Sequence, residues 1–118
     1  MSDTPGVELT TIEKTGGAVV ARPQGKMMDR NVLDALERTI DQASESEPRA
    51  PLVILDLSRV AIIPSLALAI LMRLAAKYAG RQQRLKLAAL QPQVRKVFAH
   101  SRLDEKFQFA DSVDAAIE

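Results

Sequence analysis

Apolar and polar residues along this chain follow two alternating patterns. Short runs that are apolar throughout, or that alternate apolar with polar residues, are typical of β-strands, and longer runs with apolar residues every three or four positions are typical of helices. The sequence predicts strands over residues 7–13, 18–21, 52–57, 85–90 and 107–109. It predicts helices over residues 31–43, 65–79 and 91–100, a last helix that begins at residues 111–112, and a polar linker over 44–51.

The order of these elements predicts the fold class. The first two strands are joined by a short segment with Gly16 and Gly17, which favours a β-hairpin. Residues 52–57 are almost continuously apolar, as expected of a strand buried on both faces of a parallel sheet. Strands that alternate with helices after a hairpin predict an α/β fold of two or more layers with a mostly parallel mixed sheet and about four helices. A chain of 118 residues suits one domain, over residues 1–118.

The helix predicted over residues 31–43 has one apolar and one polar side. Its apolar side would face the core, and its polar side would face away from it. The core side comprises Val32, Leu33, Leu36, Ile40 and Ala43, and the opposite side comprises Asp34, Glu37, Arg38 and Asp41.

The central helix is predicted to begin at Ser65 and to end before Gly80. Pro64 favours an extended conformation at Ile63, and serine is a common helix cap. Glycine is a common helix stop. Ser65 is therefore placed at a helix N-terminus, where we expect it to cap the helix.

The central helix carries apolar residues on both sides of its first two turns. A surface helix is ordinarily polar on its outer side. Either the same chain covers the outer apolar residues, or they form a contact surface beside Ser65 that is rimmed by Arg73 and Lys77. The expected core side comprises Leu68, Leu71, Leu74, Ala75 and Tyr78, and the outer side comprises Leu66, Ala69, Ile70, Arg73 and Lys77.

Charge and composition limit the kinds of partner and the cellular location that we expect. The net charge is +1, which does not favour nucleic acid as a partner, and the longest apolar run is shorter than the ~20 residues of a membrane span. The chain has no cysteine and no signal-peptide pattern at its start, so we expect a cytoplasmic protein without direct membrane insertion. Nine basic residues against two acids lie between Arg73 and Lys106. They are either solvated helix faces or a cationic face for an acidic partner.

Residues for catalysis or metal binding do not form a recognisable group. His100 is the only histidine, which excludes a histidine metal cluster, and we expect it to be structural or solvated. No Gly-x-x-x-x-Gly-Lys-Ser/Thr loop is present, and Ser65 lacks the Gly-x-Ser-x-Gly context of a nucleophile. Asp56 is expected to bind nearby loop amides. The sequence therefore predicts a protein that is not an enzyme and has neither cofactor nor metal.

Three strings, in this order and spacing, carry a resemblance that covers nearly the whole chain. Residues 24–29 (Gln-Gly-Lys-Met-Met-Asp) are similar to a Gly-x-Leu-Asp turn. Residues 53–60 contain an apolar strand that ends in Asp-Leu-Ser, and residues 101–107 are similar to Ser-Gly-Leu-Asp-x-x-Phe. Together they resemble the STAS domain family of anti-sigma factor antagonists. The resemblance implies a non-catalytic regulator that binds a regulatory serine kinase or anti-sigma factor and is released on phosphorylation.

The family's phosphorylation signature, Asp-Ser-Ser/Thr-Gly, is altered in this chain. Its first serine, the phosphate acceptor, corresponds to Ser65, while Pro64, Leu66 and Ala67 replace the other three residues. The resemblance thus implies that Ser65 also accepts a phosphate, and the alternative is that it only caps its helix. With the helix pattern, the resemblance implies a partner-binding site and is compatible with a homodimer. The expected site comprises Gly25, Lys26, Asp29, Pro64, Ser65, Leu66, Ala67, Ala69, Ile70 and Arg73.

Two other functions remain open at this point. The chain could be a STAS-like accessory subunit that docks on a cytoplasmic ATPase of a membrane transport system, because permanent docking needs no phosphorylation. It could also be a small enzyme or nucleotide-binding protein, which the missing loops disfavour.

Overall fold

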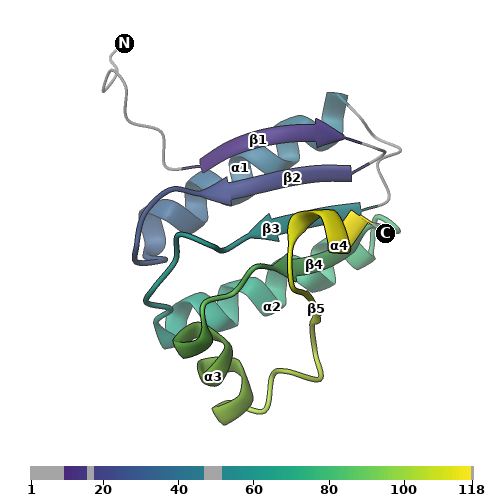
Figure 1. Cartoon of the computed structure of the whole chain (residues 1–118). Helices are drawn as coiled ribbons and strands as arrows, with labels where there is room; N and C mark the ends of the chain where they lie inside the picture. The colour runs from purple at the N-terminus through teal and green to yellow at the C-terminus, as the bar shows by residue number, and fades with distance from the viewer. Residues whose placement is uncertain (1–9, 16–17, 47–51, 118) are drawn as a thin grey trace.

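The protein forms one five-stranded mixed sheet with helices on both faces (Figure 1). The structure is a computed structural model that describes residues 10–15, 18–46 and 52–117. The strands lie side by side in chain order, with β1 antiparallel to β2 and all others parallel. They are β1 (Thr10–Thr15), β2 (Ala18–Pro23), β3 (Leu52–Asp56), β4 (Arg84–Ala88) and β5 (Gln108–Ala110). The predicted mostly parallel α/β fold with an N-terminal hairpin is therefore confirmed.

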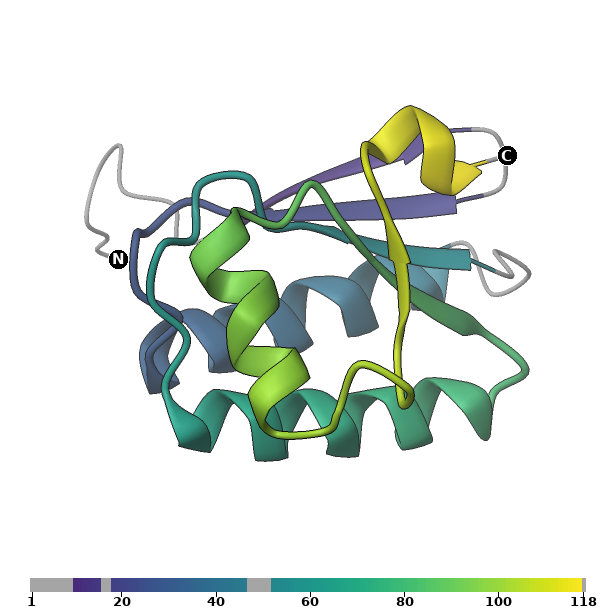
Figure 2. The same cartoon turned by 60° about the horizontal axis from the view of Figure 1, so that its bottom comes forward.

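Four helices within the described residues cover the sheet. Helix α1 packs against β1 and β2, α2 packs against β4, and α4 lies on the opposite face over β3, β4 and β5 (Figure 2). The carboxyl ends of β2 and β3 lead to the N-termini of α1 and α2, so both helices begin at the same edge of the sheet. The helices are α1 (Arg30–Ser46), α2 (Ser65–Ala79), α3 (Pro92–His100) and α4 (Val113–Ile117).

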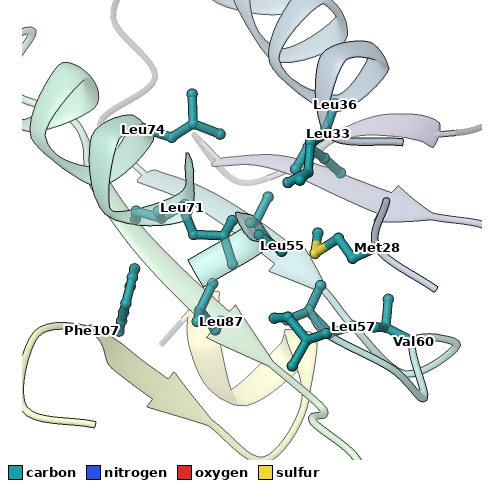
Figure 3. Packing of buried hydrophobic residues seen from close by; sticks show 14 of the residues in the cluster. Met28, Leu33, Leu36, Leu55, Leu57, Val60, Leu71, Leu74, Leu87 and Phe107 are labelled. Carbon is teal, nitrogen blue, oxygen red and sulfur yellow. The ribbon is translucent and has the colours of Figure 1, made fainter. Parts of the chain in front are cut away.

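The main core lies between the sheet and the helices α1, α2 and α3 (Figure 3). Leu55 and Leu87 of the sheet meet Leu71 and Leu74 of α2 in this cluster, and all are fully buried. A second, smaller cluster lies under α4 and contains Ile54. Successive residues of β3 thus belong to the two opposite clusters, which explains why its sequence is almost continuously apolar.

The three phenylalanines of the chain pack together where α3 meets β5. Phe98 contacts Phe107 and Phe109 edge to face, with ring centroids 5.4 and 5.5 Å apart. The guanidinium of Arg95 lies 4.1 Å from the centre of the Phe109 ring, a favourable cation–π distance. These contacts attach α3 to the edge strand.

Helix α2 ends at Ala79 with Gly80 at its C-cap, as predicted, but not because of the conformational freedom of glycine. Gly80 has φ −65°, a helical value, so its conformational freedom is not used. The left-handed residue is Gln82 (φ 62°), which donates to Ala79 while Gln83 donates to Tyr78, the pattern of a Schellman motif. The end of the helix was therefore predicted correctly, while the left-handed residue that closes the motif lies two positions after the glycine.

Several predicted boundaries shift by a few residues. Residues 7–9 of the first predicted strand, the glycines of the hairpin turn and residues 47–51 of the predicted linker lie outside the described residues. Helix α1 continues to Ser46, so the linker begins later than predicted. Phe107 precedes β5, whose last residue is Ala110.

Candidate partner-binding site

Two loops at the carboxyl ends of β2 and β3 are joined by backbone hydrogen bonds. The amides of Ala61 and Ile62 donate to the Lys26 carbonyl at 2.7 and 3.0 Å, and the Met28 amide donates to the Ile62 carbonyl at 3.0 Å. Met27 and Ile62 thereby form an isolated parallel β-bridge. This bridge holds the loop before α1 against the loop before α2.

The bridge also determines which apolar side chains face solvent. Residues that follow one another in an extended segment point to opposite sides. Met28 and Ile63 are buried in the main core, whereas Met27 is 44% exposed and Ile62 is 51% exposed. The two loops therefore present one methionine and one isoleucine to solvent next to the start of α2.

Ser65 is the first residue of α2 and is exposed, but it is not the helix cap. The capping position is Pro64, whose carbonyl accepts a hydrogen bond from the amide of Ala67 at 2.9 Å. The prediction that Ser65 caps the helix is thus wrong by one residue. The side chain of Ser65 is exposed to solvent and makes no hydrogen bond to the other described residues.

The outer side of α2 is apolar at its start, as predicted, although not every predicted residue is accessible. Leu66 is 48% exposed and Ala69 is also exposed. Ile70 is partly buried and packs against the main core, so it contributes only part of its surface. Ala67 is fully buried, and its assignment to the partner-binding site was wrong because its side chain belongs to the core.

Arg73 and Lys77 bind to α1, an arrangement that the sequence did not reveal. Arg73 contacts Glu37 at 2.9 Å, and Lys77 contacts Glu37 and Asp41 at 2.8 Å each. Arg81 adds a contact to Asp41 at 3.2 Å. We call these five residues the α1–α2 ladder. Glu37 and Asp41 therefore lie between the helices rather than facing away from the protein.

The ladder shifts the ionisation of its members. Hydrogen bonds from Arg73 and then Lys77 lower the pKa of Glu37 to about 2, and hydrogen bonds to Asp41 and then Glu37 raise the pKa of Lys77. Glu37 and Asp41 neutralise Arg73 and Lys77, the two cations that were predicted to rim an exposed apolar surface. The ladder fixes the relative position of the two helices whose N-termini flank the paired loops.

The nine basic residues between Arg73 and Lys106 do not form one cationic face. Three belong to the ladder, and Lys86 donates to the Ala116 carbonyl at 2.9 Å on the other face of the sheet. Arg95 stacks on a phenylalanine ring. Of the two alternatives for these residues, the single cationic face for an acidic partner is therefore not supported.

The other predicted site residues lie in the loop before α1. Gly25 is half-buried and Lys26 is exposed. Asp29 is exposed, and its side-chain oxygen accepts a hydrogen bond from the Val32 amide at 3.0 Å. This is the usual bond of a helix cap, so Asp29 has a structural role at the start of α1.

Asp56 binds a nearby loop amide, as predicted. One oxygen accepts from the Ser58 amide at 3.0 Å, and the other pairs with Arg22 at 3.1 Å, a contact that the sequence did not suggest. His100 is exposed. Within residues 10–15, 18–46 and 52–117, the structure holds no group of acidic or histidine side chains able to hold a metal ion.

Met27 and Ile62 are the site residues that sequence reasoning missed. Both stand first in an apolar pair, Met27–Met28 and Ile62–Ile63. Such a pair in a short extended segment must place one side chain inward and one outward. That signal was present, but its use required knowing that the two loops pair with each other.

Known proteins share the fold of this chain. The family model of the STAS domain matches residues 10–116. No curated protein matches the chain. Among solved structures, an anti-sigma factor antagonist from Mycobacterium paratuberculosis is 26% identical, with 98% of this chain and 96% of that chain covered and a TM-score of 0.76.

Two further solved structures share the fold at lower identity. An anti-sigma-factor antagonist (STAS) domain protein from Planctomyces limnophilus is 18% identical, with 92% and 94% coverage and a TM-score of 0.74. A sulfate transporter family protein from Wolinella succinogenes is 19% identical, with 86% and 82% coverage and a TM-score of 0.71. In the part of the chain that the structure describes, no helix is both long and apolar enough to cross a membrane.

Proposed function

Because the chain belongs to the STAS domain family, we propose that it is a non-catalytic regulatory module that acts by binding another protein. The observation that carries this proposal is the group of exposed apolar side chains around an exposed serine. We define the docking surface as Met27, Ile62, Ser65 and Leu66, from the paired loops and the first turn of α2. Exposed apolar clusters of this kind are typical of protein interaction sites.

The proposed partner is a regulatory serine kinase or anti-sigma factor in the cytoplasm. The 26% identical relative is described as an anti-sigma factor antagonist. A kinase must bind the segment that it phosphorylates, and Ser65 lies within the docking surface with its hydroxyl open to solvent. One surface would therefore serve both for binding and for modification.

Phosphorylation of Ser65 would disrupt binding while leaving the fold intact. A phosphate adds roughly two negative charges, which are costly to desolvate against Leu66 and Ile62 in a closed interface. Within the protein alone, the same charge lies at the N-terminus of α2, where free amides and the helix dipole favour an anion. The modified chain would remain folded and lose its partner.

The altered residues of the family signature are compatible with this role. Ala67 replaces a glycine, and its side chain fits into the main core without exposure. Pro64 supplies the carbonyl that accepts the first helical hydrogen bond. Leu66 replaces a hydroxyl residue and enlarges the apolar part of the docking surface.

A second candidate function is an accessory subunit that docks on a cytoplasmic ATPase of a membrane transport system. The exposed Leu66 in place of a hydroxyl residue favours it, because an apolar contact without a phosphorylation signature suits permanent binding. The two candidates differ in their response to a kinase. Phosphorylation at Ser65 supports the first, and a permanent complex without phosphate supports the second.

Co-purification from the native cell tests the docking surface. Leu66→Asp should remove the partner while thermal unfolding stays nearly unchanged, because the Leu66 side chain is half exposed. Ala76→Asp is the matched control, since Ala76 is exposed on α2 outside the docking surface. Retention of the partner by Leu66→Asp would reject this surface.

Incubation with the co-purified kinase, followed by mass spectrometry, tests the modification. We expect a phosphate on Ser65 and none in a Ser65→Ala variant. An unmodified Ser65 after incubation with a kinase that binds the chain would end the acceptor hypothesis. The interaction proposal would then rest on Leu66→Asp alone.

A further inference from the structure

Sulfur in this chain occurs only as methionine. The sequence contains four methionines and no cysteine, so thioethers are the only side-chain sulfur atoms available to an oxidant. Met28 is fully buried, whereas Met27 and Met72 are 44% and 39% exposed. Oxidation of methionine follows solvent access, so the neighbours Met27 and Met28 differ sharply in their expected reactivity.

Oxidation of Met27 would affect partner binding because of where this residue lies. Its backbone is held in the bridge with Ile62, and its side chain belongs to the docking surface. We propose that Met27 is a site of reversible oxidation, at which a peroxide converts the thioether to a sulfoxide and thereby releases the partner. This inference rests on the proposed function of the docking surface.

The reaction needs only the side chain and hydrogen peroxide. The thioether sulfur attacks one peroxide oxygen, the O–O bond breaks, a sulfur–oxygen bond forms, and the remaining oxygen leaves as water. The sulfur loses two electrons and the peroxide gains them. Methionine sulfoxide reductases reverse the change, which makes it suitable for regulation.

The sulfoxide would affect binding more than folding. Its oxygen is a strong hydrogen-bond acceptor that a closing apolar interface would strip of water, and an unpaired polar group is costly to bury. In the unbound protein Met27 is 44% exposed and is not part of the buried core, so we expect the fold to be little affected. Met28 packs beside Leu57 and Val60 in the main core (Figure 3), where an oxidant has no access.

The test begins with peroxide treatment of the full chain and mass spectrometry of each methionine. We expect Met27 and Met72 to be oxidised and Met28 to remain intact until the protein is unfolded. Two variants then separate the exposed sites: Met72→Leu retains Met27, and Met27→Leu retains Met72. A Met27 that remains reduced while Met72 reacts would overturn the inference.

The binding arm uses the protein that co-purifies with the wild-type chain and is absent with Leu66→Asp. Peroxide should weaken binding of Met72→Leu by roughly ten- to a hundred-fold, and reductase treatment should restore it. The same peroxide treatment should change the affinity of Met27→Leu for the partner less than two-fold. If peroxide reduced binding equally in the two variants, or did not reduce the binding of Met72→Leu, the inference would be overturned. If Leu66→Asp itself retains the partner, the docking surface fails instead.

Discussion

Removing the central carboxylate of the α1–α2 ladder should destabilise the protein in a pH-dependent way. Glu37 bonds to both Arg73 and Lys77, and its pKa falls from 4.5 to about 2. At about 1.4 kcal/mol per pKa unit, this difference corresponds to at most about 3.5 kcal/mol. The Arg73 side chain is 56% exposed, so solvent screening reduces the expected loss in Glu37→Gln to about 1–2 kcal/mol.

The direction of the pH dependence follows from the lowered pKa. A carboxylate whose pKa is lower in the folded state stabilises the protein above its unfolded pKa, and that stability is lost as the pH falls. The free-energy difference between wild type and Glu37→Gln should therefore be complete at pH 7 and shrink steadily from about pH 4.5 towards pH 2.

Urea unfolding at pH 7, 5, 4 and 3 measures this difference. Glu105→Gln is the matched control, because Glu105 is exposed and lies outside the ladder. It should leave the stability at pH 7 within about 0.5 kcal/mol of wild type. A Glu37→Gln difference that stays constant from pH 7 to pH 3, or that is absent at pH 7, would refute the ladder as a source of stability.

Three further predictions concern single residues. Arg102 has φ 58° in the Schellman motif that ends α3, so Arg102→Gly should raise the free energy of unfolding by about 1 kcal/mol. A loss of stability in denaturant titration would contradict this. The Tyr78 hydroxyl is buried without a hydrogen-bond partner among the described residues, so Tyr78→Phe should leave the melting temperature equal or higher. A clear fall would reveal a missed partner. Ile70→Asp should lower the melting temperature far more than Leu66→Asp, because Ile70 packs against the core. Equal melting temperatures would contradict that difference in burial.

Hydrophobic periodicity predicted the fold well because burial dominates the pattern of this chain. The bounds of α2 were predicted correctly, and Val32, Leu33, Leu36, Ile40 and Ala43 of α1 are all buried as expected. Each of these elements packs one continuous apolar side against the sheet. The buried positions of such an element can be predicted from the sequence of that element alone.

Features that depend on two elements were not predicted. The ladder was missed because Glu37 and Asp41 occupy the polar side of α1, and a single-helix pattern does not show which neighbour that side meets. Met27 and Ile62 were missed for the same reason, since their exposure depends on the pairing of two loops. The start of α2 was predicted correctly, but the cap was assigned to its first residue, Ser65, instead of to the residue before it, Pro64.

Hydrogen–deuterium exchange of the chain alone and with its co-purified partner tests the docking surface most directly. We predict slower exchange on binding at residues 26–29 and 60–70, which include the paired loops and the start of α2. Exchange in α3 and α4 should be unchanged. Protection confined to α3 or α4, with the paired loops unaffected, would contradict the proposed docking surface.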